Sequence, residues 1–178
     1  MAEQTGDSDA ALIVAWQRGE EAAGSELVRR HTNALARFLA AAGAGEDLED
    51  LVQETFFRAF RRLSGFRGTA SFRTWLMAIG SNALKDQRRR RRAVVLPIED
   101  REVEDAGSDP HAEALERDLL RRLQAEVATL PRMQRDVFLM RAQQGADYEE
   151  IASVLGTSVG AARVHYHHAV KRLKAVLE

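Results

Sequence analysis

Residues 130–173 read LPRMQRDVFLMRAQQGADYEEIASVLGTSVGAARVHYHHAVKRL, and this stretch decides the fold of the C-terminal part of the chain. Asp147 and Glu150 have the capping-box spacing that is typical of the start of a helix. Gly156 follows, where a tight turn between two helices needs a permissive backbone. The stretch therefore predicts a helix-turn-helix.

The last helix of this stretch carries side chains suited to DNA. Thr157 or Ser158 can cap its start. If its apolar positions pack inward, the polar side chains that remain on the outer face are Arg163, His165, His167 and His168. A second helix of this kind fits the major groove. The alternatives are an ordinary helical hairpin with a basic surface and a metal site. Zinc needs three or four ligands, and these histidines have no carboxylate or cysteine near them in sequence, so no metal is expected.

The composition indicates a helical protein outside the membrane. The 178 residues suffice for one domain or two small ones, and Ala, Leu, Arg and Glu dominate, which favours helix. The absence of cysteine excludes disulfides and thiolate zinc sites. No apolar run approaches the roughly 18 residues that span a bilayer. The polar N-terminus lacks the apolar region of a signal peptide. We therefore expect a cytoplasmic protein without membrane insertion.

The charge is segregated along the chain. A net charge of −1 alone argues against a nucleic-acid partner. However, residues 88–92 are consecutive arginines, the C-terminal helix is basic, and the stretch between them, 99–109, is acidic. Phosphate attraction is local, because salt screens charges beyond about 8–10 Å. The separate basic segments can therefore bind DNA, although the net charge of the whole chain gives no such indication.

The N-terminal part predicts a helical domain with one well-defined amphipathic helix. We expect one helix that Asp9 caps at its start, and a second helix over residues 25–42. Residues 48–63 then show the clearest period, with apolar side chains at three- and four-residue steps. The opposite, polar face contains Phe57. This phenylalanine is either an isolated exposed aromatic, which is common, or an anchor for a partner protein.

An aromatic loop and a linker complete the organisation. The loop over 65–71 contains glycines, and Ser71 can cap the helix that carries Trp75, which we expect in the core. Residues 93–111 are acidic and lack a helical period, which is typical of an extended linker. We therefore predict an all-α chain with two small helical domains, 1–92 and 112–178, joined by the linker 93–111.

Together these residues resemble the extracytoplasmic-function (ECF, group 4) sigma factors of bacterial RNA polymerase, in the sigma-70 family. The resemblance covers nearly the whole chain. Residues 9–31 resemble the opening helices, and 50–56 (DLVQETF) the helix that binds core polymerase. Residues 66–82 are similar to the segment that reads and melts the promoter −10 element, and 130–173 to the region-4 domain that reads the −35 element.

The resemblance implies roles for three sets of residues. The −35 element would be read by Tyr148, Ser158, Arg163, Val164, His165, His167, His168 and Lys171. The −10 element would be read by Phe66, Arg67, Gly68, Thr69, Ser71, Phe72, Asn82, Lys85 and Arg88. The clamp helices of core RNA polymerase would dock on Asp47, Asp50, Gln53, Glu54, Phe57 and Arg58. Further implied partners are the polymerase flap, promoter DNA and an anti-sigma factor, without any cofactor.

The sequence departs from the family pattern at the recognition helix. Where the family usually has Thr-Val-Lys-Ser-Arg, residues 161–165 read Ala161-Ala162-Arg163-Val164-His165, and His168 replaces a usual arginine. We expect the fold to survive, with a changed promoter preference and weaker phosphate contacts at neutral pH. Gly24 stands where an aromatic residue is common, which predicts looser packing of the first helices.

The function expected from these residues is that of an alternative sigma factor, with no catalytic chemistry of its own. No nucleophile–base pair or phosphate-binding loop is found in the sequence. One rival is a helix-turn-helix regulator that binds DNA without polymerase. Another is an enzyme or scaffold whose helical hairpin is incidental. The acidic linker either follows the RNA channel of the polymerase, as the family implies, or is a solvated tether.

Overall fold

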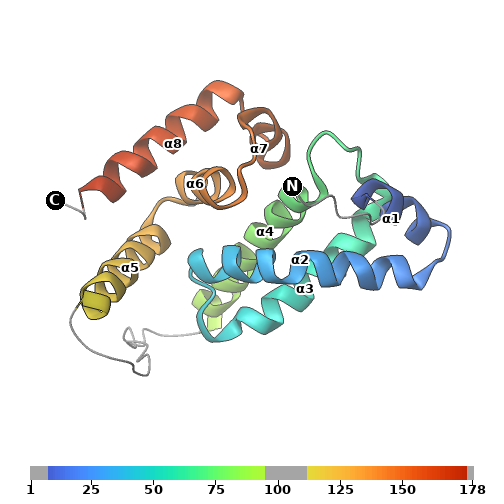
Figure 1. The fold of residues 1–178 in the computed structure, drawn as a ribbon, viewed down its shortest axis with the longest axis horizontal. Coiled ribbons are helices and arrows are strands. Elements are labelled where there is room, and N and C mark those ends of the chain that lie inside the picture. The colour runs from blue at the N-terminus through green and yellow to red at the C-terminus, as the bar shows by residue number, and fades with distance from the viewer. Residues whose placement is uncertain (1–7, 95–111, 176–178) are drawn as a thin grey trace.

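The computed structural model describes residues 8–94 and 112–175, and every regular element in these ranges is a helix. Figure 1 shows two groups of helices, which we call the N-terminal bundle (8–94) and the C-terminal bundle (112–175). The predicted all-α class is confirmed. The expected linker, 93–111, lies outside the described residues except for 93–94, which continue a helix. Within the described ranges, no helix combines the length and apolar character needed to cross a membrane.

The N-terminal bundle ends in its longest helix, which packs against the two helices before it. Its elements are α1 (Asp9–Gln17), α2 (Glu21–Ala41), η1 (Gly45–Asp47), α3 (Leu48–Arg62), η2 (Leu63–Gly65) and α4 (Phe72–Val94), where η marks a short 3-10 helix. The apolar face of α3, predicted from its period, packs with α2 and α4. Leu35 and Phe38 of α2 and Met77 of α4 are completely buried there. This core positions the loop before α4 and the outer face of α3.

Helix α1 begins differently from the expectation. Ser8, not Asp9, caps it, because the Ser8 hydroxyl accepts a hydrogen bond from the Ala11 amide at 3.2 Å. The Asp9 carboxylate instead reaches α2, 2.8 Å from His31 Nε2 and 3.5 Å from Arg30. Burial lowers the pKa of His31 and outweighs the opposing effect of Asp9. Asp9 therefore joins two helices instead of starting one.

The position of Gly24 is filled from a neighbouring helix. Two atoms of the Trp16 ring lie 2.6 and 2.7 Å from where a Cβ atom of residue 24 would stand. The Trp16 ring also packs against Phe60 of α3, with 4.8 Å between ring centroids. Helix α1 thus places an aromatic ring against Gly24. A hollow of about 330 Å³, lined by Trp16, Gly24 and Phe60 among others, opens beside this contact, and the looser packing of the first helices stays a prediction.

The C-terminal bundle contains the predicted helix-turn-helix. Its helices are α5 (Ala112–Thr129), α6 (Arg132–Gln144), α7 (Tyr148–Leu155) and α8 (Val159–Lys174). Asp147 Oδ1 accepts from the Glu150 amide at 2.7 Å, and Ser158, not Thr157, caps α8 through the Ala161 amide. Gly156 between them has φ +65°, a left-handed conformation that favours glycine. The local signals in the sequence are therefore confirmed.

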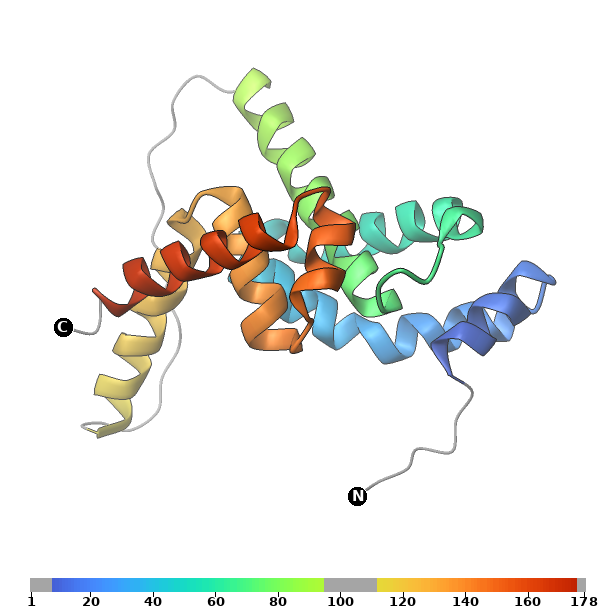
Figure 2. The ribbon, with the colours of Figure 1, turned by 90° about the horizontal axis from the view of Figure 1, so that it is seen from above.

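The two bundles pack directly on each other. Helices α6 and α7 contact α4, and α5 and α6 contact α2. In Figure 2, α6 and α7 lie over the N-terminal bundle, and Figure 1 shows that α8 stands beyond α6, on the side away from that bundle. Residues 69–82, which precede and begin α4, therefore lie beside residues 132–153, far away in the sequence.

Candidate DNA and protein interfaces

The outer face of α8 is a continuous stripe of exposed side chains. On its inner face, α8 packs on the bundle through small side chains, and Ala162 and Ala169 are completely buried there. The side chains exposed on the outer face are Arg163, Val164, His167, His168 and Lys171, at three- and four-residue steps. The predicted outward orientation is confirmed for Arg163, His167 and His168, whereas His165 is half-buried at the edge of the stripe.

Tyr148 supports this stripe from α7. Its ring centre lies 5.1 Å from the Arg141 guanidinium carbon and 5.5 Å from that of Arg163, within the range of cation–π attraction. Tyr166 meets the same ring edge-on, with 6.1 Å between centroids. Tyr148 is half-buried by these contacts. It therefore orients Arg163, while Ser158 uses its hydroxyl to cap the helix.

The loop before α4 carries an aromatic cluster. The Phe66 ring lies 5.1 Å from that of Trp75 and 6.1 Å from that of Phe72. Phe72 is buried, with its ring edge-on to His31, and Trp75 is half-buried against the core. Arg67 and Gly68 are exposed, and Gly68 has φ +68°. The cluster fixes both ends of a loop whose tip is free to contact a partner.

A hollow of about 210 Å³ opens beside this cluster. One side is formed by the loop, including Phe66 and Thr69, and by Trp75. The other side is formed by Ser153 and Val154 of α7, from the C-terminal bundle. The hollow therefore exists in this form only while the bundles are in contact.

The middle of α4 presents two of the three predicted side chains that lie beyond its first turn. Asn82 and Lys85 are exposed. Arg88 instead turns toward α2, where its Nη2 donates to the carbonyl oxygens of Ala42 at 2.8 Å and Gly43 at 3.0 Å. Burial lowers the pKa of Arg88. In this structure Arg88 caps the end of α2 and does not face outward with the other predicted −10 residues.

The outer face of α3 keeps Asp50, Gln53 and Phe57 exposed, and Phe57 has 57% of its surface in solvent. Arg61 lies over the Phe57 ring, 5.5 Å from its centre. The Arg58 guanidinium donates to Glu54 at 2.6 Å and to Asp86 of α4 at 2.8 Å. This contact lowers the pKa of Asp86. At the other end of α3, Asp47 pairs with Arg91 of α4. The exposed residues thus stand on a face that ion pairs fix to α4.

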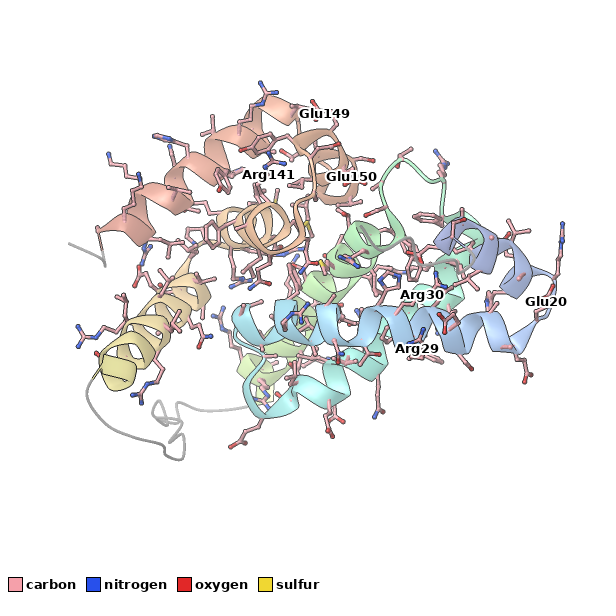
Figure 3. All side chains as sticks on the ribbon, viewed as in Figure 1. Glu20, Arg29, Arg30, Arg141, Glu149 and Glu150 are labelled. Atoms are coloured by element: carbon pink, nitrogen blue, oxygen red, sulfur yellow. The ribbon has the colours of Figure 1, made fainter. Side chains whose placement is uncertain are left out.

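Five polar pairs among the described residues join the bundles, and we call them the closing contacts. Two reach the loop: the Ser71 amide donates to Glu150 Oε1 at 2.6 Å, and the Thr69 and Ser153 hydroxyls lie 2.9 Å apart. Three reach α4: Arg132 Nη2 donates to Asn82 Oδ1 at 2.7 Å, Arg132 Nε donates to the Ser81 hydroxyl at 3.2 Å, and the Ser81 hydroxyl donates to Asp136. Figure 3 places Glu150 on the side of α7 that faces the loop, with Glu149 further out.

Asp136 is the one closing residue that is completely buried. Arg132 Nε lies 3.3 Å from Asp136 Oδ2, and Arg135 Nε 3.7 Å from Asp136 Oδ1. Burial raises the pKa of Asp136 and outweighs the hydrogen bond from Ser81 and the two arginine charges. Burial also lowers the pKa of Arg135, which Asp136 opposes. The Asp136 carboxylate is therefore held by groups from both bundles, Ser81 of the N-terminal bundle and the two arginines of the C-terminal bundle.

The closing contacts were not predicted from the sequence. The capping box at residues 147–150 was predicted, but only half of it forms: Asp147 accepts from the Glu150 amide, while the Glu150 carboxylate turns to Ser71. Residues 132–136 gave a helical signal without any sign of a partner. Arg135 and Asp136 are buried, but α6 also carries polar residues at 132, 134 and 141, so the sequence did not distinguish a buried polar contact from an exposed one.

Known proteins match both bundles. Sigma-70 region 2 matches residues 27–94, and Sigma-70, region 4 matches residues 120–173. The ECF RNA polymerase sigma-E factor of Haemophilus influenzae is 34% identical over 173 residues, which cover 92% of this chain and 90% of that protein. RNA polymerase sigma factor NccH of Alcaligenes xylosoxydans xylosoxydans is 32% identical over 176 residues, which cover 96% and 95%.

Solved structures match over both bundles as well. CnrH, solved in complex with the cytosolic domain of CnrY, is 32% identical with a TM-score of 0.72, and the match covers 96% of this chain and 97% of that one. The sigma factor RpoE of Bartonella quintana, in complex with the anti-sigma factor NepR, has a TM-score of 0.68 at 23% identity, covering 86% and 95%. RpoE therefore supports the fold alone.

An exposed helix-turn-helix on one bundle and an aromatic loop on the other define a bipartite DNA-binding protein. With the similarities above, the chain belongs to the extracytoplasmic-function sigma factors of the sigma-70 family. It is an alternative sigma factor, a transcription initiation factor that binds core RNA polymerase and promoter DNA and is not an enzyme. We now call residues 27–94 region 2 and residues 120–173 region 4.

Proposed function

We propose that region 4 reads the −35 element through the outer stripe of α8. The stripe is exposed, basic and continuous, and this observation carries the proposal. Arg163 is the strongest candidate for a base contact, because an arginine fork can bind guanine O6 and N7. Val164 offers an apolar contact to a thymine methyl, and His167, His168 and Lys171 contact the backbone or neighbouring bases. His165, Ser158 and Tyr148 support the edge and start of the helix.

Region 2 reads the −10 element with the loop and the first turns of α4. The contacting residues in this proposal are Phe66, Arg67, Gly68, Thr69, Ser71, Asn82 and Lys85. The hollow beside Phe66 supports capture of an unstacked base, since unstacking costs a few kcal/mol that aromatic stacking offsets. Phe72 supports the loop from below, because it is buried. Arg88 has no place in this surface.

Core polymerase docks on the outer face of α3. Asp50, Gln53 and Phe57 are exposed on it, and Phe57 is a large apolar side chain in solvent, as expected of an interface anchor. Glu54, Arg58 and Asp47 fix this face to α4 through their ion pairs. The clamp helices of the polymerase are the proposed partner of this face, and the polymerase flap is the proposed partner of region 4.

An anti-sigma factor is the proposed regulator, and the cytoplasm the proposed location. CnrH was solved in complex with the cytosolic domain of CnrY, and RpoE in complex with an anti-sigma factor. We extend this kind of partnership to the present chain. The location follows from a partner, core polymerase, that works on the chromosome.

Specific run-off transcription by the purified chain and core polymerase tests the proposal. Phe57→Ala should weaken core binding by about tenfold or more while circular dichroism stays unchanged. Val14→Ala, which shortens another exposed apolar side chain, is the matched control and should bind normally. Normal core affinity of Phe57→Ala would remove Phe57 from the interface. Specific DNA protection without core polymerase, and no start site with it, would support a stand-alone regulator.

A further inference from the structure

We propose that His31 of α2, held by Asp9 of α1, is a positioning residue for promoter melting. The ring of His31 sets the place of Phe72, and Phe72 sets the place of the Phe66 ring, on which an unpaired base of the −10 element stacks. The inference rests on the proposed −10 function of the loop. It gives helix α1, which the proposed function leaves without a role, a part in the opening of DNA.

The imidazole of His31 is buried and held from one side. It has 4% of its surface in solvent, and its Nε2 atom lies 2.8 Å from Asp9 Oδ2. Its Nδ1 atom is also buried, and the part of the chain that the structure describes offers this atom no hydrogen-bond partner. An ionised carboxylate only accepts, so the single N–H of the neutral ring stands at Nε2. Asp9 therefore selects one tautomer and one orientation of the ring.

The surroundings of His31 keep its ring neutral. Burial lowers the pKa of His31, the Asp9 carboxylate opposes this shift, and the charges of Arg73 on α4 and Arg30 on α2 lower the pKa further. Protonation would also place a second N–H at Nδ1, where the described residues provide no acceptor. The imidazole is therefore a fixed neutral ring at physiological pH, and it supplies no charge for DNA.

Phe72 connects this ring to the loop. The rings of His31 and Phe72 meet edge-on with 5.1 Å between their centroids, and the Phe72 ring lies 6.1 Å from that of Phe66 and 5.9 Å from that of Trp75. Phe72 is buried, so its ring moves only if its close-packed neighbours move. Figure 1 shows α1 and the loop at the same end of the N-terminal bundle. The contacts thus form a continuous path from the start of α1 to the hollow beside Phe66.

Packing alone does not account for a histidine at this position. Burial of Nδ1 without a partner is unfavourable, and an aliphatic side chain would fill the space without burying a polar atom. A ring that is hydrogen-bonded to a carboxylate has one defined orientation, which an aliphatic side chain lacks. A base binds more tightly to an aromatic ring that is already in place, because no ring has to be ordered on binding. The pair of Asp9 and His31 is therefore suited to preorganise Phe66.

Nitrogen NMR of the free chain tests the orientation of the His31 ring. The nitrogen chemical shifts of a histidine side chain distinguish its two tautomers, and the signals of His31 are those that disappear in His31→Leu. We expect the proton on Nε2 in the wild type at neutral pH. A proton on Nδ1, or a mixture of both tautomers, would overturn the proposal, because Asp9 would then not hold the ring.

Substitutions in the holoenzyme test the positioning role. The probes are two non-template −10 oligonucleotides of a promoter mapped by its transcription start: one is intact, and one lacks the base whose removal weakens the wild-type complex most. Asp9→Ala should lower the ratio of the two affinities about three- to tenfold, because stacking of that base on Phe66 is partly lost. His31→Leu should lower it as well. Partial unfolding of the chain would weaken the binding of both probes alike and leave the ratio unchanged.

Ser8→Ala is the matched control. It removes the hydroxyl that caps α1 at the Ala11 amide and leaves the Asp9 carboxylate in place, so the ratio should stay at the wild-type value. An equal fall in Ser8→Ala and Asp9→Ala would assign the effect to a loosened α1, and an unchanged ratio in Asp9→Ala would leave His31 a packing residue; either result overturns the proposal. If no base removal weakens the wild-type complex, the proposed −10 function fails, whereas the NMR measurement still reports the contact between Asp9 and His31.

Discussion

The two promoter-reading surfaces of this sigma factor are presented in opposite ways. In region 4, the α8 stripe faces solvent along its length. In region 2, the loop and the start of α4 are hydrogen-bonded to region 4 at Thr69, Ser71 and Asn82. The surface proposed to read the −35 element is open to solvent in this structure, whereas the surface proposed to read the −10 element is partly covered. The difference teaches that exposure of a binding surface depends on the arrangement of the domains as well as on their folds.

Chemistry explains which surface is covered. Region 2 offers neutral donors and acceptors, a backbone amide, hydroxyls and an amide side chain, and these pair with the Glu150 carboxylate, the Ser153 hydroxyl and the Arg132 guanidinium, which keep part of their exposure to water. The α8 stripe offers cations and imidazoles, which water solvates well and which lose more by burial without a partner. Covering region 2 is therefore the easier way to close this molecule.

The largest effect is expected for Asp136, which is buried where region 4 packs on region 2. Asp136→Ala leaves Arg135 buried without its carboxylate, and we expect a loss of about 3 kcal/mol in the free energy of unfolding, as for other broken buried ion pairs. Asp118→Ala, which breaks an exposed i,i+4 pair with Arg122, is the control and should cost less than about 0.5 kcal/mol. Urea denaturation measures both. Equal small losses would mean that Asp136 contributes little to closure.

Arg163 lies on the exposed surface of region 4, and its substitution should weaken DNA binding without changing the stability of the fold. Arg163→Ala should weaken binding to the −35 element by about 1–3 kcal/mol, because a base-reading guanidinium is removed while the inner face of α8 is untouched. Electrophoretic mobility shifts of the holoenzyme on matched and mutated −35 elements measure this. Equal weakening on every promoter would show that Arg163 contacts phosphate alone.

Arg88 sharpens the comparison, because the family resemblance assigns it to DNA and the structure to the fold. Arg88→Ala removes the cation that caps α2 at Ala42 and Gly43, and we expect a loss of about 1.5 kcal/mol in unfolding free energy. The −10 sequence preference of the holoenzyme should not change. Lys85→Ala, on the exposed face of the same helix, should behave in the opposite way. A changed −10 preference in Arg88→Ala would return this arginine to the DNA surface.

Sequence reasoning predicted local structure better than contacts between distant residues. The caps at Asp147, Ser158 and Ser71 and the exposure of Phe57 follow from spacing and periodicity, which act within a few residues, and all are confirmed. The Glu150 carboxylate could not be predicted in the same way. Its capping partner stands three residues away, yet it binds Ser71, 79 residues away, because the domain arrangement offers a better donor.

Trp16 illustrates the same limit within one domain. The sequence shows a glycine where an aromatic residue is common, and it does not show that a ring from the preceding helix fills the space. The direction of Arg88 is a further case, since only the end of α2 in space tells a capping arginine from a DNA-binding one.

The smallest expected effect is a pH dependence of closure, and it tests the buried side without a large perturbation. Burial raises the pKa of Asp136 in the closed form, while opening would return the carboxylate to water and to its ordinary pKa. The closed form therefore binds a proton more tightly than the open form. Its share of the population should be greatest in acid and decline as the pH rises through the raised pKa of Asp136. Arg132, Arg135 and Arg88 face this group and remain charged throughout.

The distance between spin labels at two exposed positions, one in each bundle, should therefore show a growing long component as the pH rises above the ordinary range of an aspartate. Asp136→Asn keeps the shape without the titration and should remove this trend. Burial lowers the pKa of His31, so protonation of His31 destabilises the fold of region 2 in acid and acts in the opposite direction. A trend that persists in Asp136→Asn would belong to another group. A trend that is absent in both chains would mean that the carboxylate stays solvated on closing, and the two promoter-reading surfaces would then differ less than this structure indicates.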